Sequence, residues 1–94
     1  MGKPVVLART ADDSPLLQRA VTAHYRQHAH ERRFPAPTPS ADSCLCELDG
    51  RRYVVLRAAD GRVLRVYRVR FVRTHQMHQL YQLKRWPKEL EEAR

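Results

Sequence analysis

Arginine is the side chain with the clearest chemistry in this sequence, and it is concentrated between residues 51 and 86. That segment holds ten Lys or Arg residues against one Asp, whereas residues 35–50 carry a net charge of −3 and residues 87–94 a net charge of −1. A guanidinium group pairs with phosphate through two parallel hydrogen bonds, and a tyrosine ring offers a flat face on which a base can stack. Together with the formal net charge of +8 for the whole chain, this pattern indicates contacts with a polyanion.

Ten residues of this region are predicted to form a nucleic-acid-binding surface. Most of their contacts would be to phosphates, which carry no sequence information, so the pattern does not distinguish RNA from DNA. The ten residues are Arg51, Tyr53, Arg57, Arg62, Arg68, Arg70, Arg73, Lys84, Arg85 and Trp86.

Two pairs of candidate metal ligands are present, Cys44-x-Cys46 and His75-x-x-His78. Two thiolates and two imidazoles can enclose a zinc ion tetrahedrally. The two cysteines are separated by one residue, however, whereas zinc sites usually separate them by two to four. We therefore expect small buried cysteines rather than a metal site. His24 and His28 lack a third ligand nearby, so no metal or other cofactor is expected.

Histidine and arginine together could also support general acid–base catalysis, as in small ribonucleases that include toxin-type enzymes. The chain holds five His residues. Yet no two titratable side chains stand at a recognisable catalytic spacing, no glycine-rich phosphate loop is present, and the serines lack a nucleophile context. The sequence therefore favours a binding protein over an enzyme, and a ribonuclease-type toxin is the weaker alternative.

The elements that position these side chains begin with two Asp-Gly pairs, Asp49-Gly50 and Asp60-Gly61, set between runs of β-branched and aromatic residues. Asp-Gly in this setting predicts a two-residue type I′ turn, because both central residues need a positive φ angle. Residues 44–86 are therefore predicted to form an antiparallel meander of three or four strands. In the corresponding register Ala59 lies opposite Arg62, Arg57 opposite Leu64, and Val55 opposite Val66.

This register divides the meander into two faces. The first face carries the predicted arginine and tyrosine contacts around a small apolar centre, and the second, more apolar face is expected to pack against a helix. A one-residue bulge would exchange these assignments. The first face holds Cys44, Cys46, Leu48, Arg51, Tyr53, Val55, Arg57, Arg62, Leu64, Val66, Arg68 and Arg70. The second holds Leu45, Glu47, Arg52, Val54, Leu56, Ala58, Val63, Arg65, Tyr67, Val69 and Phe71.

A helix is predicted over residues 14–33. Ser14 supplies an N-cap and Pro15 the first helical position, and apolar or aromatic residues then recur at intervals of three and four. Before the helix, residues 1–13 form an arm or an edge strand, and after it the alternating prolines of residues 34–43 form a semi-rigid linker. The predicted helical stripe consists of Leu17, Ala20, Val21, His24, Tyr25 and His28.

Residues 74–85 are compatible with two structures. Thr74 as a cap, with apolar residues at helical spacing after it, favours a second helix, whereas a sheet still short of strands favours a polar loop followed by a strand at 80–86. We predict the strand. Pro87 then begins a short helix over residues 87–94, whose carboxylates suit the positive end of the helix dipole.

The sequence thus predicts one small α+β domain over residues 1–94, with a long N-terminal helix packed on a three- to four-stranded antiparallel β-meander and a short C-terminal helix. The favoured partner is nucleic acid, either RNA or DNA, and the alternative is an adaptor or inhibitor that binds an acidic protein surface. Apolar residues on both faces also favour a homodimer. A cytoplasmic location without membrane contact is expected, because the sequence shows neither a signal peptide nor a membrane span.

Overall fold

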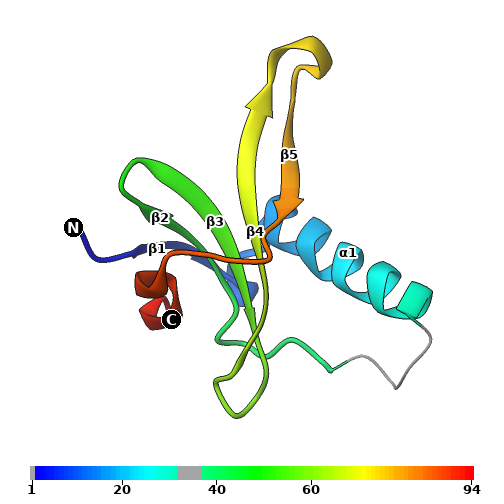
Figure 1. The fold of residues 1–94 in the computed structure, drawn as a ribbon, viewed down its shortest axis with the longest axis vertical. Coiled ribbons are helices and arrows are strands. Elements are labelled where there is room, and N and C mark those ends of the chain that lie inside the picture. The colour runs from blue at the N-terminus through cyan, green and yellow to red at the C-terminus, as the bar shows by residue number, and fades with distance from the viewer. Residues whose placement is uncertain (1, 32–36) are drawn as a thin grey trace.

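A five-stranded antiparallel sheet with one α-helix against one of its faces is the centre of the computed structural model (Figure 1). The structure describes residues 2–31 and 37–94. The strands lie side by side in chain order, so the sheet is a meander, and the predicted α+β class is confirmed. The main elements are β1 (Val5–Arg9), α1 (Pro15–Glu31), β2 (Cys44–Leu48), β3 (Arg51–Arg57), β4 (Val63–Val72) and β5 (Met77–Gln82). The predicted three or four strands become five because β1 and β5 both pair with the central three.

The two Asp-Gly pairs form different turns. Both residues of the first pair, Asp49-Gly50, have positive φ angles of 52° and 79°, so the predicted type I′ turn is confirmed. At the second pair only Gly61 has a positive φ, of 89°, and the Ala58 N–H donates to the Arg62 carbonyl. The second turn is therefore a three-residue loop rather than the predicted two-residue turn. A hydrogen bond of 2.9 Å from the Arg62 N–H to Asp60 Oδ1 stabilises the longer loop.

The longer loop shifts the pairing of β3 with β4 by one residue, and a bulge at Leu64 shifts it back. Arg57 pairs with Val63 instead of Leu64, but from Val55 and Val66 onward the predicted register is confirmed. The predicted pairing of β2 with β3 is confirmed throughout. Only the residues between loop and bulge change face, so Val63 packs with the first face and Leu64 with the second.

Helix α1 covers the second face, as predicted. It begins at Pro15, and the Ser14 hydroxyl accepts a hydrogen bond of 3.4 Å from the Leu17 N–H. Tyr25, predicted to belong to the buried stripe, lies on its flank and is 40% exposed. Residues 32–36, which include the end of the predicted helix and the start of the predicted linker, lie outside the described residues. No helix in the described part of the chain is long and apolar enough to cross a membrane. The fully buried residues of α1 are Leu17, Ala20 and His24.

His24 connects α1 to β4 and to the segment that follows the helix. Arg65 Nε donates to His24 Nδ1 at 2.9 Å, so Nδ1 is an acceptor and the ring proton lies on Nε2. Nε2 then donates to the Pro37 carbonyl at 2.8 Å. This buried histidine therefore holds the helix, the sheet and the connecting segment together.

β5 is a strand, as predicted, but it lies at residues 77–82 rather than 80–86. The shift arises because a single 3₁₀ turn at Arg73–His75 reverses the chain. Met77 can then pair with Val72 at the end of β4. The alternative of a helix over residues 74–85 is wrong.

The C-terminal segment, defined as residues 83–94, packs across the first face of the sheet (Figure 1). Leu90 and Ala93 are buried there, and Leu83 and Trp86 are half-buried against the same cluster. The segment contains a 3₁₀ helix at Lys88–Glu92 in place of the predicted α-helix. The chain itself therefore covers the face that the sequence predicts to be partly open.

Arg57 holds the C-terminal segment in place. Its side chain is only 1% exposed. Its Nε donates to the Ala93 carbonyl at 3.0 Å, and its Nη2 donates to the carbonyls of Leu90, at 3.3 Å, and Glu91. Its Nη1 donates to the Gly61 carbonyl at 2.9 Å. Burial lowers the pKa of this guanidinium, but arginine stays charged near neutral pH, so four carbonyl dipoles stabilise one buried positive charge.

Replacing Arg57 by Met is expected to lower the free energy of unfolding by about 3–5 kcal/mol, because it leaves four buried or partly buried carbonyls without their donor. Chemical denaturation followed by circular dichroism measures this free energy, and Trp86 fluorescence reports whether the C-terminal segment leaves the sheet. The matched control is Arg62→Met at an exposed position, which is expected to change stability by less than about 0.5 kcal/mol. An Arg57→Met protein as stable as the control would show that the buried contacts contribute no net stability.

Candidate nucleic-acid interface

Two of the ten predicted contact residues are not accessible at the surface. Arg57 is buried beneath the C-terminal segment, and Tyr53 is 4% exposed because it packs in the same apolar cluster as Cys46 and Val55. The prediction that Arg57 and Tyr53 lie on an open binding face is therefore wrong. The physical reason is that the C-terminal segment occupies that face.

The other eight predicted residues are at least partly exposed, but they do not form one surface. Arg62 lies in the loop after β3, at the opposite end of that strand from Arg51. Trp86 packs against the first-face cluster, and Arg73 lies at the tip of the β4–β5 hairpin. The exposed residues are Arg51, Arg62, Arg70, Arg73, Lys84 and Arg85, and the half-buried ones are Arg68 and Trp86.

Three of the eight, Arg51, Arg68 and Arg70, line a single hollow of about 440 Å³, here termed the arginine hollow. The sequence predicts these three residues, and the structure adds a fourth arginine, Arg52, beside them. The complete lining is Gly50, Arg51, Arg52, Arg68, Val69, Arg70, Phe71 and His78.

The arginine hollow exists because β4 is longer than β3. β3 has seven residues and β4 has ten. The pairing of β3 with β4 ends at Arg52 and Val69, whereas the pairing of β4 with β5 continues to Val72 and Met77. The β4–β5 hairpin therefore projects beyond the rest of the sheet (Figure 1). The lining residues come from the β2–β3 turn, the start of β3 and this projecting hairpin.

The charge of the arginine hollow is not neutralised within it, because no carboxylate lines it. Across residues 2–31 and 37–94, none of its four guanidinium groups forms an ion pair. Arg68 Nε is buried and has no hydrogen-bond partner among the described residues. A buried donor without a partner costs free energy that a bound anion could recover. Four like charges on one concave surface also raise the local positive potential.

Phe71 and His78 add an aromatic wall to the hollow. They lie opposite each other on β4 and β5, and their rings meet edge to face with centroids 5.2 Å apart. Phe71 is 53% exposed. An exposed ring held by a neighbouring ring and next to guanidinium groups is suited to stacking against a base.

Arg52, Phe71 and His78 are absent from the sequence-predicted surface. Strand alternation places Arg52 and Phe71 on the second face, and the pairing of Arg52 with Val69 confirms that assignment for Arg52. At the start of β3, however, residues of both faces line the same hollow. The sequence holds one signal for these residues: the alternating run after Gly61 is longer than the run before Asp60, so the strand after Gly61 extends past its neighbour.

The four candidate zinc ligands do not come together. Cys44 and Cys46 are buried in the first-face cluster, whereas His75 lies exposed at the hairpin tip and His78 lines the arginine hollow. No group of three or more His, Cys, Asp or Glu side chains that could hold a metal occurs in the described ranges. A hydrogen bond between the thiols lowers the pKa of Cys44 and raises that of Cys46, so the two cysteines interact with each other.

Comparison with known proteins identifies no relative. No protein-family model matches the chain, and neither the curated proteins nor the solved structures include a match. A function must therefore be inferred from the geometry and charge of the arginine hollow.

Proposed function

We propose that this chain binds nucleic acid through the arginine hollow. The observation that carries the proposal is the convergence of four arginines on one concave surface that has no carboxylate in its lining. Guanidinium groups bind phosphate oxygens through paired N–H donors, and such contacts supply most of the sequence-independent affinity for nucleic acid. The formal net charge of +8 adds a long-range attraction for a polyanion.

The residues of the hollow have different roles in the proposed complex. Arg51 and Arg70 are exposed and contact phosphates at the rim. Arg68 is half-buried, and its unpartnered Nε suits a phosphate that enters more deeply. Phe71 stacks on a base, and His78 holds the phenyl ring in place. Both RNA and DNA supply the phosphates and bases that these roles require.

Replacing Arg51 and Arg70 together by Gln is expected to weaken binding about tenfold or more, because two charge-assisted phosphate contacts are lost. The slope of log affinity against log salt concentration should become shallower by about 1.5. Fluorescence anisotropy of a labelled oligonucleotide, measured over a salt series, gives both quantities.

The matched control for this experiment is the double variant Arg62→Gln, Lys88→Gln. It removes the same charge from exposed positions that do not line the hollow. Its affinity should change only slightly. Equal losses of affinity in the two double variants would mean that overall charge governs binding, and the arginine hollow would be rejected as the site.

Replacing Phe71 by Ala is expected to cost about 1–3 kcal/mol of binding free energy, because one base loses its stacking partner. The salt slope should not change, since no charge is removed. Tyr81→Ala is the matched control: Tyr81 is 46% exposed, does not line the hollow, and pairs with Arg68 on the face of the hairpin opposite to Phe71. A larger loss with Tyr81→Ala would place the stacking surface on that other face.

Binding of an acidic protein surface is the second candidate function. The edge strand β1 favours it, because Val5 and Leu7 are 60% and 44% exposed and provide apolar surface of the kind that protein partners bury. β1 lies at the opposite edge of the sheet from β5, however, and does not contribute to the arginine hollow. Absence of binding to single-stranded and duplex RNA and DNA near physiological salt would favour this candidate.

A further inference from the structure

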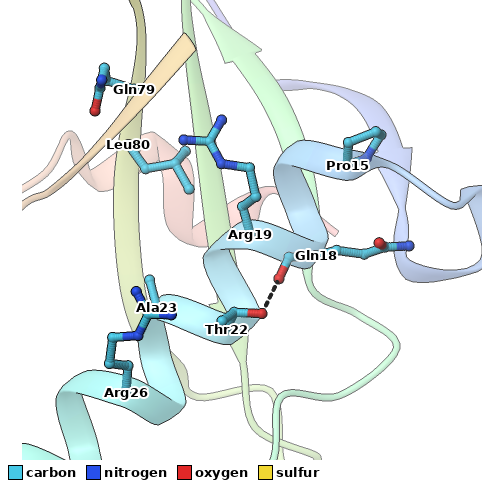
Figure 2. A pocket seen from close by; sticks show the side chains of 8 residues that line it. All are labelled: Pro15, Gln18, Arg19, Thr22, Ala23, Arg26, Gln79 and Leu80. Carbon is cyan, nitrogen blue, oxygen red and sulfur yellow. Dashed lines mark hydrogen bonds between the residues drawn. The ribbon is translucent and has the colours of Figure 1, made fainter. Parts of the chain in front are cut away.

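A second concave surface, here termed the helix groove, lies between α1 and β5 (Figure 2). Its volume is about 540 Å³. Gln79 and Leu80 line it from β5, and they directly follow His78, which lines the arginine hollow. The helix groove and the arginine hollow are therefore adjacent along β5. The helix groove is lined by Pro15, Gln18, Arg19, Thr22, Ala23, Arg26, Gln79 and Leu80.

The helix groove carries two arginines on one side of α1. Arg19 and Arg26 are seven residues apart, so they lie two turns and about 10 Å from each other along the helix axis. Arg19 Nη1 donates to the His78 carbonyl at 2.9 Å, which holds this guanidinium where the groove meets the hollow. A guanidinium has five N–H donors, so this bond leaves others for a ligand. No carboxylate lines the groove.

The rest of the groove suits an unpaired base. Ala23 and Leu80 offer apolar contacts against which the face of an unpaired base can pack. Neither glutamine of the lining directs a free amide into the groove: the Gln18 amide donates to Asp13 Oδ1 at 2.5 Å, and Gln79 pairs with Arg70, so its side chain lies on the face of β5 opposite to Leu80. The volume also lies within the range of small-ligand sites, roughly 300–1,000 Å³.

We infer that one single strand of nucleic acid runs from the arginine hollow across β5 into the helix groove. This inference rests on the proposed function of the hollow. Successive phosphates of the strand would contact the guanidinium groups of the hollow and then Arg19 and Arg26, which lie two helical turns apart. Unpaired bases stack on Phe71 and enter the groove beside Leu80.

A duplex does not suit this path. Double-stranded DNA is stiff over about 150 base pairs and keeps its bases stacked inside, so it can neither bend around β5 nor place a base in the groove. A single strand turns at each nucleotide and presents its bases to aromatic and apolar side chains. The ligand class is therefore single-stranded RNA or DNA.

A length series tests this path. The probes are labelled homopolymers of uridine and of thymidine, about four and about twelve nucleotides long, together with a duplex of the longer length. Fluorescence anisotropy with the full chain is expected to show that the longer strand binds about tenfold or more tightly than the shorter strand, because only the longer strand reaches both surfaces. Both longer strands should bind more tightly than the duplex.

The double variant Arg19→Gln, Arg26→Gln should remove most of the advantage of the longer strand and leave the affinity for the shorter strand unchanged. Arg51→Gln, Arg70→Gln should weaken both. Arg19→Gln also removes the hydrogen bond to the His78 carbonyl, so Arg26→Gln alone serves as a second variant that leaves this contact intact. Circular dichroism checks that each variant is folded, and Arg62→Gln, Lys88→Gln is the control for lost charge.

Two kinds of failure are distinguishable. If the unmodified chain binds strands but the groove variants behave like the charge control, the path into the helix groove is wrong and the hollow remains the site. Equal affinity for the duplex and the longer strands would also overturn the path. If the unmodified chain binds neither the strands nor the duplex, the proposed function fails, and the inference fails with it; binding of the duplex alone overturns only the path.

Discussion

The buried guanidinium of Arg57 is the interaction on which the rest of this structure depends. A charge removed from water costs several kcal/mol unless it is compensated, and here main-chain carbonyls supply the compensation. Three of them belong to residues 90–93, so the charge can be buried only when the C-terminal segment lies on the first face. The Arg57 N–H also donates to Ser43 Oγ at 2.9 Å, and its carbonyl accepts from the Ser40 N–H at 2.6 Å. Arg57 thus connects two segments to the central strand: one that precedes it in the sequence, at Ser40 and Ser43, and one that follows it, at residues 90–93.

This constraint decides where a ligand can bind. The C-terminal segment covers the first face and α1 covers the second, so the centre of the sheet presents no open face. Binding is then restricted to edges and projecting parts, and the β4–β5 hairpin projects furthest (Figure 1). Arginine has two separate roles as a result. Arg57 is satisfied by carbonyls inside the protein, whereas the arginines of the hollow have no acidic partner among the described residues and are available for a ligand.

Much of the sheet could be predicted from the sequence because its local signals are strong. Asp49-Gly50 determines the first turn, and strand alternation determines the two faces. The second turn is one residue longer than Asp60-Gly61 predicts, but the bulge at Leu64 cancels the shift, so the predicted faces are correct from Val55 to the start of β3. The burial of Arg57 could not be predicted in this way, because it depends on carbonyls more than 30 residues along the chain. Charged side chains are rarely buried, so alternation and charge alone place arginine at the surface.

The arginine hollow shows why alternation is an incomplete guide to a binding site. In the middle of a sheet, consecutive residues point to opposite faces, and only one of them can reach a given ligand. At the corner of the sheet where β3 begins and β4 continues past it, the two faces are no longer separated, so Arg51 and Arg52 line the same hollow. Arg51 and Arg52 stand at the start of β3, which is shorter than β4. Two consecutive arginines at such a position therefore place more charge on one surface than two in the middle of a strand can. The projecting hairpin also carries His78, which lines the hollow and whose carbonyl accepts a hydrogen bond from Arg19 of the helix groove, so the two surfaces meet at one residue.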